Sequence, residues 1–180
     1  MDIIHAMNEN TFPRHMMAAL GQRLRVMPAV VVTGARQTGK STLVKVLTLE
    51  KRSYFSLDDM DVFELARQNP EALVGGAAKV TLDEVQREPD LLLAVKRAID
   101  SDRQPGRFLL TGSANLLLMQ GVSESLAGRA SYLTLWPMTR REQLGLGRCG
   151  LWEELGAAYD AEWPDLLSVD TSGAEDWLAL

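Results

Sequence analysis

The stretch that decides the fold is Gly34-Ala35-Arg36-Gln37-Thr38-Gly39-Lys40-Ser41, which matches the P-loop pattern GxxxxGK[ST] at every fixed position. The apolar run at residues 29–32 precedes it, and a helix-compatible run begins after it at Thr42. The two glycines let backbone N–H groups approach phosphate oxygens that a side chain would otherwise keep away. A strand, a loop of this kind and a helix in that order predict a nucleoside triphosphate site and disfavour a glycine turn that matches by chance.

Two side chains of the loop have distinct predicted roles. Lys40 would reach the β- and γ-phosphates as a point charge, and the Ser41 hydroxyl would ligate Mg²⁺ together with phosphate oxygens and water. The predicted nucleotide-binding residues are Gly34, Ala35, Arg36, Gln37, Thr38, Gly39, Lys40, Ser41 and Thr42.

A second informative stretch, Lys79-Val80-Thr81-Leu82-Asp83-Glu84, is a short apolar run that ends in two acids. Asp83 would hold Mg²⁺ through its water ligands, and Glu84 would orient and polarise the attacking water. An acidic pair after a strand is also typical of helix caps and of solvent-facing turns. The P-loop upstream favours the functional interpretation.

Composition limits the class of protein. With 180 residues and 46% hydrophobic content, the chain can bury one substantial core. A single Cys149 excludes an internal disulfide framework and fits a reducing compartment, although a small, partly buried side chain is the simpler role for it. The first ten residues show no apolar signal-peptide region, and no apolar run approaches the ~20 residues that span a bilayer. We therefore expect a soluble, cytoplasmic protein without membrane contact.

Charge is distributed unevenly. The net charge is −5, all 19 Lys and Arg lie at or before Arg148, and eight of the 24 acids follow it. The preceding part is only weakly positive, which does not support nonspecific nucleic-acid binding. The acidic tail is typical of a solvated face.

Strand-like runs alternate with helical segments. Strands are expected at residues 29–32, 53–57, 79–84, 107–111 and 130–136, with a helix at 14–26 and another at 61–68 that Asn69-Pro70 would stop. This order predicts an α/β fold with a mainly parallel five-stranded sheet between helices on both faces, and a nucleotide at the carboxyl ends of the strands. Gly112-Ser113-Ala114-Asn115 would then lie at that edge, either to sense the γ-phosphate or as ordinary turn residues.

The motifs taken in order resemble the prokaryotic AAA+-type ATPases known simply as ATP-binding proteins. The resemblance covers residues 14–141 and rests on the P-loop, Leu82-Asp83-Glu84-Val85-Gln86, Leu110-Thr111-Gly112-Ser113 and Ser125-Leu126-Ala127-Gly128-Arg129. It implies a three-layer P-loop NTPase of the ASCE or AAA+ type with strand order 5-1-4-3-2. It also implies ATP rather than GTP as the nucleotide, with Mg²⁺ as its metal.

The same resemblance assigns roles to side chains. Ser113 falls at a sensor-like strand end, and Arg129 at the position of an arginine finger or nucleotide-sensing arginine, supplied by the same or by a neighbouring copy. A Gly-Arg pair before a strand also suits a surface turn. Arg36 and Gln37 match the family's loop interior, with a solvent-facing loop as the alternative. The predicted catalytic residues are Lys40, Glu84, Arg129 and Ser113, and the predicted metal ligands are Ser41 and Asp83.

The chain departs from the family at its end, because members usually continue into a C-terminal domain of unknown function. Residues 1–141 are predicted to form the P-loop ATPase core, and residues 142–180 an acidic, partly helical tail that starts a missing lid or C-terminal region. Leu151, Trp152, Leu155 and Tyr159 would form one apolar face of that tail. We expect a truncated or split member of the family.

Three functions stay open on these residues. The favoured one is an ATPase that hydrolyses ATP to ADP and phosphate with Mg²⁺ and acts on an unknown partner or domain. The second is an ATP-dependent binding or regulatory module with little or no hydrolysis, and the third a small-molecule phosphotransferase, for which no acceptor site is identified. The expected partners are ATP, an unknown protein or missing domain, and a second copy of the chain through Arg129.

Overall fold

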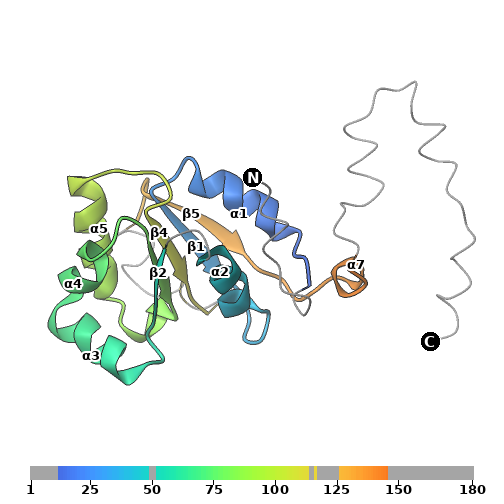
Figure 1. Cartoon of the computed structure of the whole chain (residues 1–180), viewed down its shortest axis with the longest axis horizontal. Helices are drawn as coiled ribbons and strands as arrows, with labels where there is room; N and C mark the ends of the chain where they lie inside the picture. The colour runs from blue at the N-terminus through green and yellow to red at the C-terminus, as the bar shows by residue number, and fades with distance from the viewer. Residues whose placement is uncertain (1–11, 49–51, 114–115, 117–125, 146–180) are drawn as a thin grey trace, which may run out of the picture.

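The computed structural model describes residues 12–48, 52–113, 116 and 126–145 (Figure 1). Its strands are β1 (Ala29–Thr33), β2 (Ser53–Ser56), β3 (Val80–Asp83), β4 (Phe108–Thr111) and β5 (Ala130–Thr134). Its helices are α1 (Met16–Leu24), α2 (Lys40–Thr48), α3 (Met60–Gln68), α4 (Pro70–Gly75), the 3₁₀ helix η2 (Val85–Arg87), α5 (Leu91–Ser101) and α7 (Arg140–Gln143).

The five strands form one parallel sheet in the order β2-β3-β4-β1-β5. This is the predicted order 5-1-4-3-2 counted from the other edge, so the predicted topology is confirmed. The central strand β1 pairs with β4 from Ala29 opposite Phe108, and with β5 from Ala29 opposite Ala130. Because all strands run the same way, their carboxyl ends meet at one edge, where the predicted phosphate-binding loop begins.

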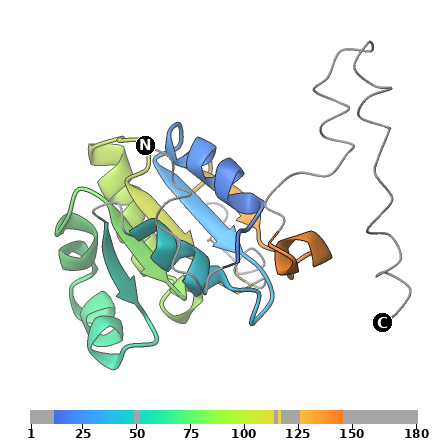
Figure 2. The same cartoon turned by 45° about the vertical axis from the view of Figure 1, so that its right-hand side comes forward.

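Helices cover both faces of the sheet, which confirms the three-layer architecture (Figure 2). Every residue of β1 is buried, as expected for a parallel strand covered on both sides. Val30 and Val32 pack with Leu20 of α1 and Val44 of α2. On the other face, Ala29 and Val31 belong to a larger core with the buried side chains of α3, α4 and α5.

Helix α4 is a difference from the sequence prediction. Helix α3 ends at Gln68, as expected before Asn69-Pro70, but Pro70 then begins another helix of six residues. Asn69 caps it, since its side chain accepts a hydrogen bond from the backbone N–H of Ala72 at 3.2 Å. Proline is tolerated at the first helical position, where its missing N–H has no intrahelical partner. The same dipeptide therefore stops one helix and starts the next.

Two further predictions concern membrane spans and the acidic tail. None of the helices in the described ranges has both the length and the apolar character needed to cross a membrane. Cys149 and the predicted apolar face from Leu151 to Tyr159 lie outside the described residues.

Candidate functional site

The loop between β1 and α2 packs too closely against β5 to accept a side chain at its first glycine. A Cβ at Gly34 would lie 2.3 Å from the backbone oxygen of Leu135, which follows β5. A hydrogen bond within the loop also stabilises it: the Thr38 hydroxyl donates to the backbone oxygen of Ala35 at 3.0 Å. Glycine is thus required at position 34 by contact, independently of any ligand.

Lys40 lies inside this loop and not in solvent. The residue is 6% exposed, and its ammonium donates to the backbone oxygens of Gly34 at 3.1 Å and Ala35 at 2.8 Å. A buried ammonium needs such partners. These carbonyl bonds hold the charge at the mouth of the loop, where phosphate oxygens could replace them.

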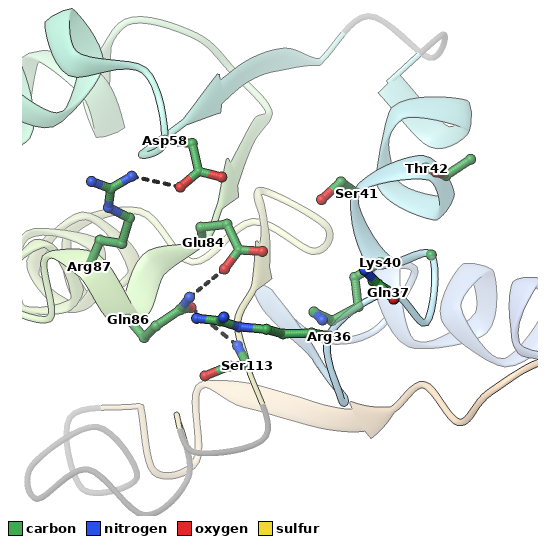
Figure 3. Close-up of a pocket in the computed structure, with 11 residues that line it drawn as sticks. Arg36, Gln37, Lys40, Ser41, Thr42, Asp58, Glu84, Gln86, Arg87 and Ser113 are labelled. Atoms are coloured by element: carbon green, nitrogen blue, oxygen red, sulfur yellow. Dashed lines mark hydrogen bonds and ion pairs between the residues drawn. The ribbon is translucent and has the colours of Figure 1, made fainter.

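A cavity of about 1030 Å³ opens at the carboxyl edge of the sheet (Figure 3). The structure brings four side chains together on its walls: Lys40 and Ser41 at the start of α2, Glu84 after β3 and Ser113 after β4. The lining residues are Arg36, Gln37, Gly39, Lys40, Ser41, Thr42, Asp58, Glu84, Gln86, Arg87 and Ser113. Eight predicted site residues from three separate segments therefore line one cavity: Arg36, Gln37, Gly39, Lys40, Ser41, Thr42, Glu84 and Ser113.

Asp83 lies at the end of β3, behind the cavity wall. It is 2% exposed and is not among the lining residues in the described part of the chain. The Tyr54 hydroxyl donates to its Oδ2 at 2.6 Å, and the Thr111 hydroxyl donates to its Oδ1. Burial, and next the hydrogen bond to Asp83, raise the pKa of the Tyr54 phenol, so it stays protonated and keeps donating.

Glu84 has an unusual backbone conformation for its residue type. Its φ is 60° and its ψ is 42°, in the left-handed region. Gln37 is the other non-glycine residue with positive φ, at 64°, in the described part of the chain. Both residues line the same cavity. Conformations of this kind cost about 1 to 3 kcal/mol and concentrate at functional sites, which supports a functional role for this cavity.

Arg129 lies elsewhere. It precedes β5, at the amino edge of the sheet, where its backbone oxygen accepts from Ala29 N–H at 3.2 Å. Its guanidinium binds both carboxylate oxygens of Asp100, Nε at 2.6 Å and Nη2 at 3.0 Å. This hydrogen-bonded pair lowers the pKa of the Asp100 carboxyl. The structure therefore does not bring Arg129 to the cavity of its own chain, and a role in a neighbouring copy stays a prediction.

Arg14 is a residue of the site that sequence reasoning missed. Its guanidinium donates to the backbone oxygen of Thr38 in the P-loop at 2.7 Å, to that of Trp136 at 2.7 Å, and to Glu142 Oε1 at 3.1 Å. Its side chain is 9% exposed. The partners are 24 to 128 positions away in the chain, so no local motif marks them. Arg14 joins the phosphate-binding loop to the segment that follows β5.

Glu142 is the anionic partner in this group of contacts. It also accepts from the backbone N–H of His15 and of Thr139, each at 2.8 Å, and the Thr139 contact forms a capping box for α7. Burial alone raises the pKa of the Glu142 carboxyl, but the two N–H bonds and Arg14 together lower it below its ordinary value. The predicted boundary after Arg141 falls inside α7, and Glu142 contacts the core across it.

Replacing Glu142 with glutamine should lower the free energy of unfolding by about 1 to 3 kcal/mol, because a buried donor then loses its acceptor. The unfolded carboxyl titrates near 4.5 and the folded one lower. The contribution is therefore complete above pH 4.5 and is lost as the pH falls through the folded pKa. Urea unfolding measured at several pH values should show the difference between wild type and variant shrinking on acidification.

The matched control is Glu71→Gln, because Glu71 also pairs with an arginine, Arg97, but on the surface. Water screens an exposed pair, so its loss should change the free energy of unfolding much less. Equal losses in the Glu142 and Glu71 variants would contradict a special role for the buried pair.

Asp58 is a cavity residue that the sequence analysis missed, although the rule that carboxyl ends of parallel strands meet at one edge predicts it. Asp58 follows β2 and lies at the same edge as every other strand end, so its place in the cavity follows from the parallel sheet. Its carboxylate binds Arg87 at 2.6 Å. Gln86 is part of the motif Leu82-Asp83-Glu84-Val85-Gln86, on which the family resemblance partly rests, but the sequence alone did not assign a role to its side chain. Its contacts with Glu84 and Ser113 are visible in Figure 3.

The side chains available to a metal ion limit how one could bind in this cavity. No group of three or more His, Cys, Asp and Glu side chains among residues 12–48, 52–113, 116 and 126–145 is arranged to hold a metal ion by itself. A Mg²⁺ at this cavity would have Ser41 as a direct protein ligand, and phosphate oxygens and water would complete its octahedral shell. This donor chemistry fits a metal that arrives with a nucleotide.

A second cavity of about 370 Å³ lies on the other side of the P-loop. It shares Gln37, Gly39 and Thr42 with the first cavity. Its remaining lining is mainly apolar. Thr38, Leu43 and Val46 come from the P-loop and α2, and the others come from the two ends of the described chain: Phe12, Arg14, Met17, Pro137 and Met138. A polar and an apolar cavity therefore flank one phosphate-binding loop.

Comparison with known sequences gives a family and two relatives. The model of a family described as an AAA domain matches residues 27–144. The uncharacterized proteins Rv2008c of Mycobacterium tuberculosis and Mb2031c of Mycobacterium bovis are each 36% identical to this chain over 131 residues. That stretch covers 72% of this chain and 30% of each relative, so the chain spans less than a third of the relatives it matches.

Comparison with solved structures shows a shared fold. The Walker-type ATPase Paby2304 of Pyrococcus abyssi is similar with a TM-score of 0.54 and 17% identity, over 84% of this chain and 61% of that one. A DNA replication initiation factor is similar with a TM-score of 0.53 and 16% identity, over 84% of this chain and 53% of that one. At these identities the likeness concerns the arrangement of the chain and not its substrate.

Proposed function

This chain belongs to the AAA domain family, and on that premise we propose that it binds ATP with Mg²⁺ and hydrolyses it to ADP and phosphate. One observation carries the proposal: Lys40, Ser41, Glu84 and Ser113 line a single cavity although they come from three segments of the chain. A triphosphate there would have a cation, a metal ligand and a carboxylate within one enclosure. That set is what phosphoryl transfer to water needs.

The roles within this proposal follow from burial and contacts. Lys40 would exchange its bonds to the loop carbonyls for bonds to the β- and γ-phosphates. Asp83 is buried and already accepts from two hydroxyls, so it would act on the metal through water. Mg²⁺, when bound, would neutralise charge on the phosphate oxygens. Glu84 faces the cavity and would orient the attacking water.

The nucleoside is proposed to lie in the second, apolar cavity. That cavity adjoins the P-loop through Gln37, Gly39 and Thr42, so phosphates in the first cavity and a base in the second would belong to one ligand. An apolar lining with a few polar groups suits a purine ring. Met138, which is half-buried, is the side chain whose truncation removes base contact without touching the loop.

The variant Met138→Ala is expected to raise the dissociation constant for ATP about 3- to 10-fold, since one apolar side chain loses its contact. Its affinity for inorganic tripolyphosphate, which has no base, should stay within about twofold. Calorimetric titrations of both ligands would measure this. Equal weakening for both ligands, or none for ATP, would reject the second cavity as the base site.

The experiment that tests the proposed function is a phosphate-release assay on the purified chain, with Mg²⁺ and then with excess chelator. We expect release that needs Mg²⁺ and no added acceptor. Tight ATP binding without release would instead support a binding or regulatory module, an alternative favoured by the distance of Arg129 from the cavity. Release only with an added hydroxyl compound would point to a phosphotransferase.

Partners are also proposals. Arg129 would reach a nucleotide only in a neighbouring copy, and only after leaving Asp100. Self-association that increases with ATP and weakens in Arg129→Ala would support this role. Hydrolysis would then act on a partner protein or on a further domain.

A further inference from the structure

Gln86 connects two of the groups that the proposed reaction needs. It lies in η2, two residues after Glu84, and lines the cavity. Its side-chain amide nitrogen donates to Glu84 Oε2, and its amide oxygen accepts from the backbone N–H of Ser113 at 3.2 Å. Figure 3 shows this continuous link from Glu84 through Gln86 to Ser113. The end of β3 and the end of β4 are thereby joined across the cavity wall.

The two partners fix which way the amide faces. Ser113 offers an N–H, which only the amide oxygen can accept, and Glu84 offers a carboxylate oxygen, which only the amide nitrogen can approach as a donor. Reversing the amide would lose both bonds. Gln86 is therefore oriented by the end of β4 and in turn orients Glu84.

The space around the amide also explains a glycine. A Cβ at Gly112 would lie 3.0 Å from Gln86 Oε1 and 2.5 Å from Leu116 Cδ2. A side chain at residue 112 would therefore press on the Gln86 amide oxygen and more strongly on Leu116. This close packing distinguishes the link from a chance contact of an exposed glutamine.

The backbone of Glu84 is fixed separately. Its N–H donates to the Thr111 hydroxyl at 3.1 Å, and that hydroxyl donates to Asp83. These bonds set the left-handed conformation of Glu84 but leave its side-chain torsions free. Among the described residues, Gln86 provides the hydrogen bond that restrains the carboxylate. Being neutral, an amide can hold a carboxylate without cancelling its charge as lysine or arginine would.

We propose that Gln86 is a positioning residue for the water-activating step: it holds one oxygen of the Glu84 carboxylate and leaves the other to face the attacking water. This assignment rests on the proposed ATPase function. It adds that the carboxylate is anchored to the end of β4 through Ser113 N–H, so Glu84 and the predicted sensor position move together. Gln86 itself does not touch the nucleotide in this role.

The test compares Gln86→Met with wild type. Methionine keeps the volume and removes both amide bonds, so turnover should fall about 10- to 100-fold through misplacement of Glu84. The affinity for ATP should stay within about twofold, because the phosphate contacts are unchanged. The matched control is Gln68→Met, at an exposed position of α3, which is expected to behave as wild type.

A second variant covers the case in which Gln86→Met does not fold. Gln86→Glu keeps the shape but replaces the amide donor by a second carboxylate, which cannot hold Glu84 Oε2 and repels it. Turnover should again fall while the affinity for ATP is retained.

A double-mutant cycle separates positioning from general damage. In a Glu84→Gln background, Gln86→Met should lower turnover by less than about twofold, because no carboxylate remains to be positioned. A further drop as large as in wild type would overturn the proposal, as would ATP affinity that falls in step with turnover. If wild type releases no phosphate, the proposed hydrolysis and this assignment both fail. A different result would reject only the role of Gln86. In that result wild type releases phosphate, Glu84→Gln releases much less, and Gln86→Met releases as much as wild type.

Discussion

Replacing Glu84 with glutamine should lower turnover by about 10²- to 10⁴-fold while ATP binding stays within about twofold. Glutamine has nearly the same shape, so the cavity wall and the contact region of Gln86 are kept. The variant loses the negative charge that polarises the attacking water. A loss in turnover without a loss in affinity is expected when a group acts in the transition state and not in ground-state binding.

The measurement is steady-state phosphate release together with equilibrium titration of ATP. The matched control is Glu64→Gln at an exposed position of α3, which makes the same chemical change away from the cavity. Turnover that survives in Glu84→Gln would reject Glu84 as the water-orienting group. Loss in both variants would indicate an effect of charge that has no connection with this site.

The second large effect is expected for Lys40→Met, which should weaken ATP binding by about 10²- to 10³-fold. Charge-assisted hydrogen bonds contribute about 1.5 to 3 kcal/mol each, and Lys40 is predicted to contact two phosphates. Methionine keeps the apolar part of the side chain, but the carbonyls of Gly34 and Ala35 lose their donor, so circular dichroism should first establish that the variant is folded. The wild-type ammonium is already held by the carbonyls of Gly34 and Ala35, which means that the charge is in place before the nucleotide arrives.

Calorimetric titration with ATP and Mg²⁺ measures this change. Lys79→Met is the control, because Lys79 is exposed and precedes β3 at the opposite edge of the sheet. It should bind ATP as wild type does. An unchanged affinity in Lys40→Met would mean that triphosphates do not bind at this loop.

The parts of the fold that follow from short segments could be predicted from the sequence. The strand before the P-loop is a run of buried apolar residues, and further strands alternate with helices along the rest of the described chain. The right strand order came with the family resemblance, because the motifs in order specify a topology that periodicity alone does not. Helix α4 was missed because Asn69-Pro70 satisfies both the end of α3 and the start of the next helix.

The candidate site also contains residues that the sequence predicted and residues that it did not. Lys40, Ser41, Glu84 and Ser113 were predictable because each ends or follows a strand of a parallel sheet, and the sheet brings such positions together. Arg14 and Glu142 were not, because they are 128 positions apart and meet only after β5 is in place. Arg129 shows the limit of a motif: its sequence position matches a catalytic arginine, while its side chain pairs with Asp100 at the other edge.

The central claim is that one triphosphate, with its metal, lies between the P-loop and the acids at the end of β3. A crystal structure of the full chain with Mg²⁺ and a non-hydrolysable ATP analogue tests it most directly. We predict phosphates against Lys40 and Ser41 in the larger cavity, with Glu84 facing the terminal phosphate and the base beside Met138. An analogue bound away from residues 34–41, or a terminal phosphate turned away from Glu84, would contradict the account.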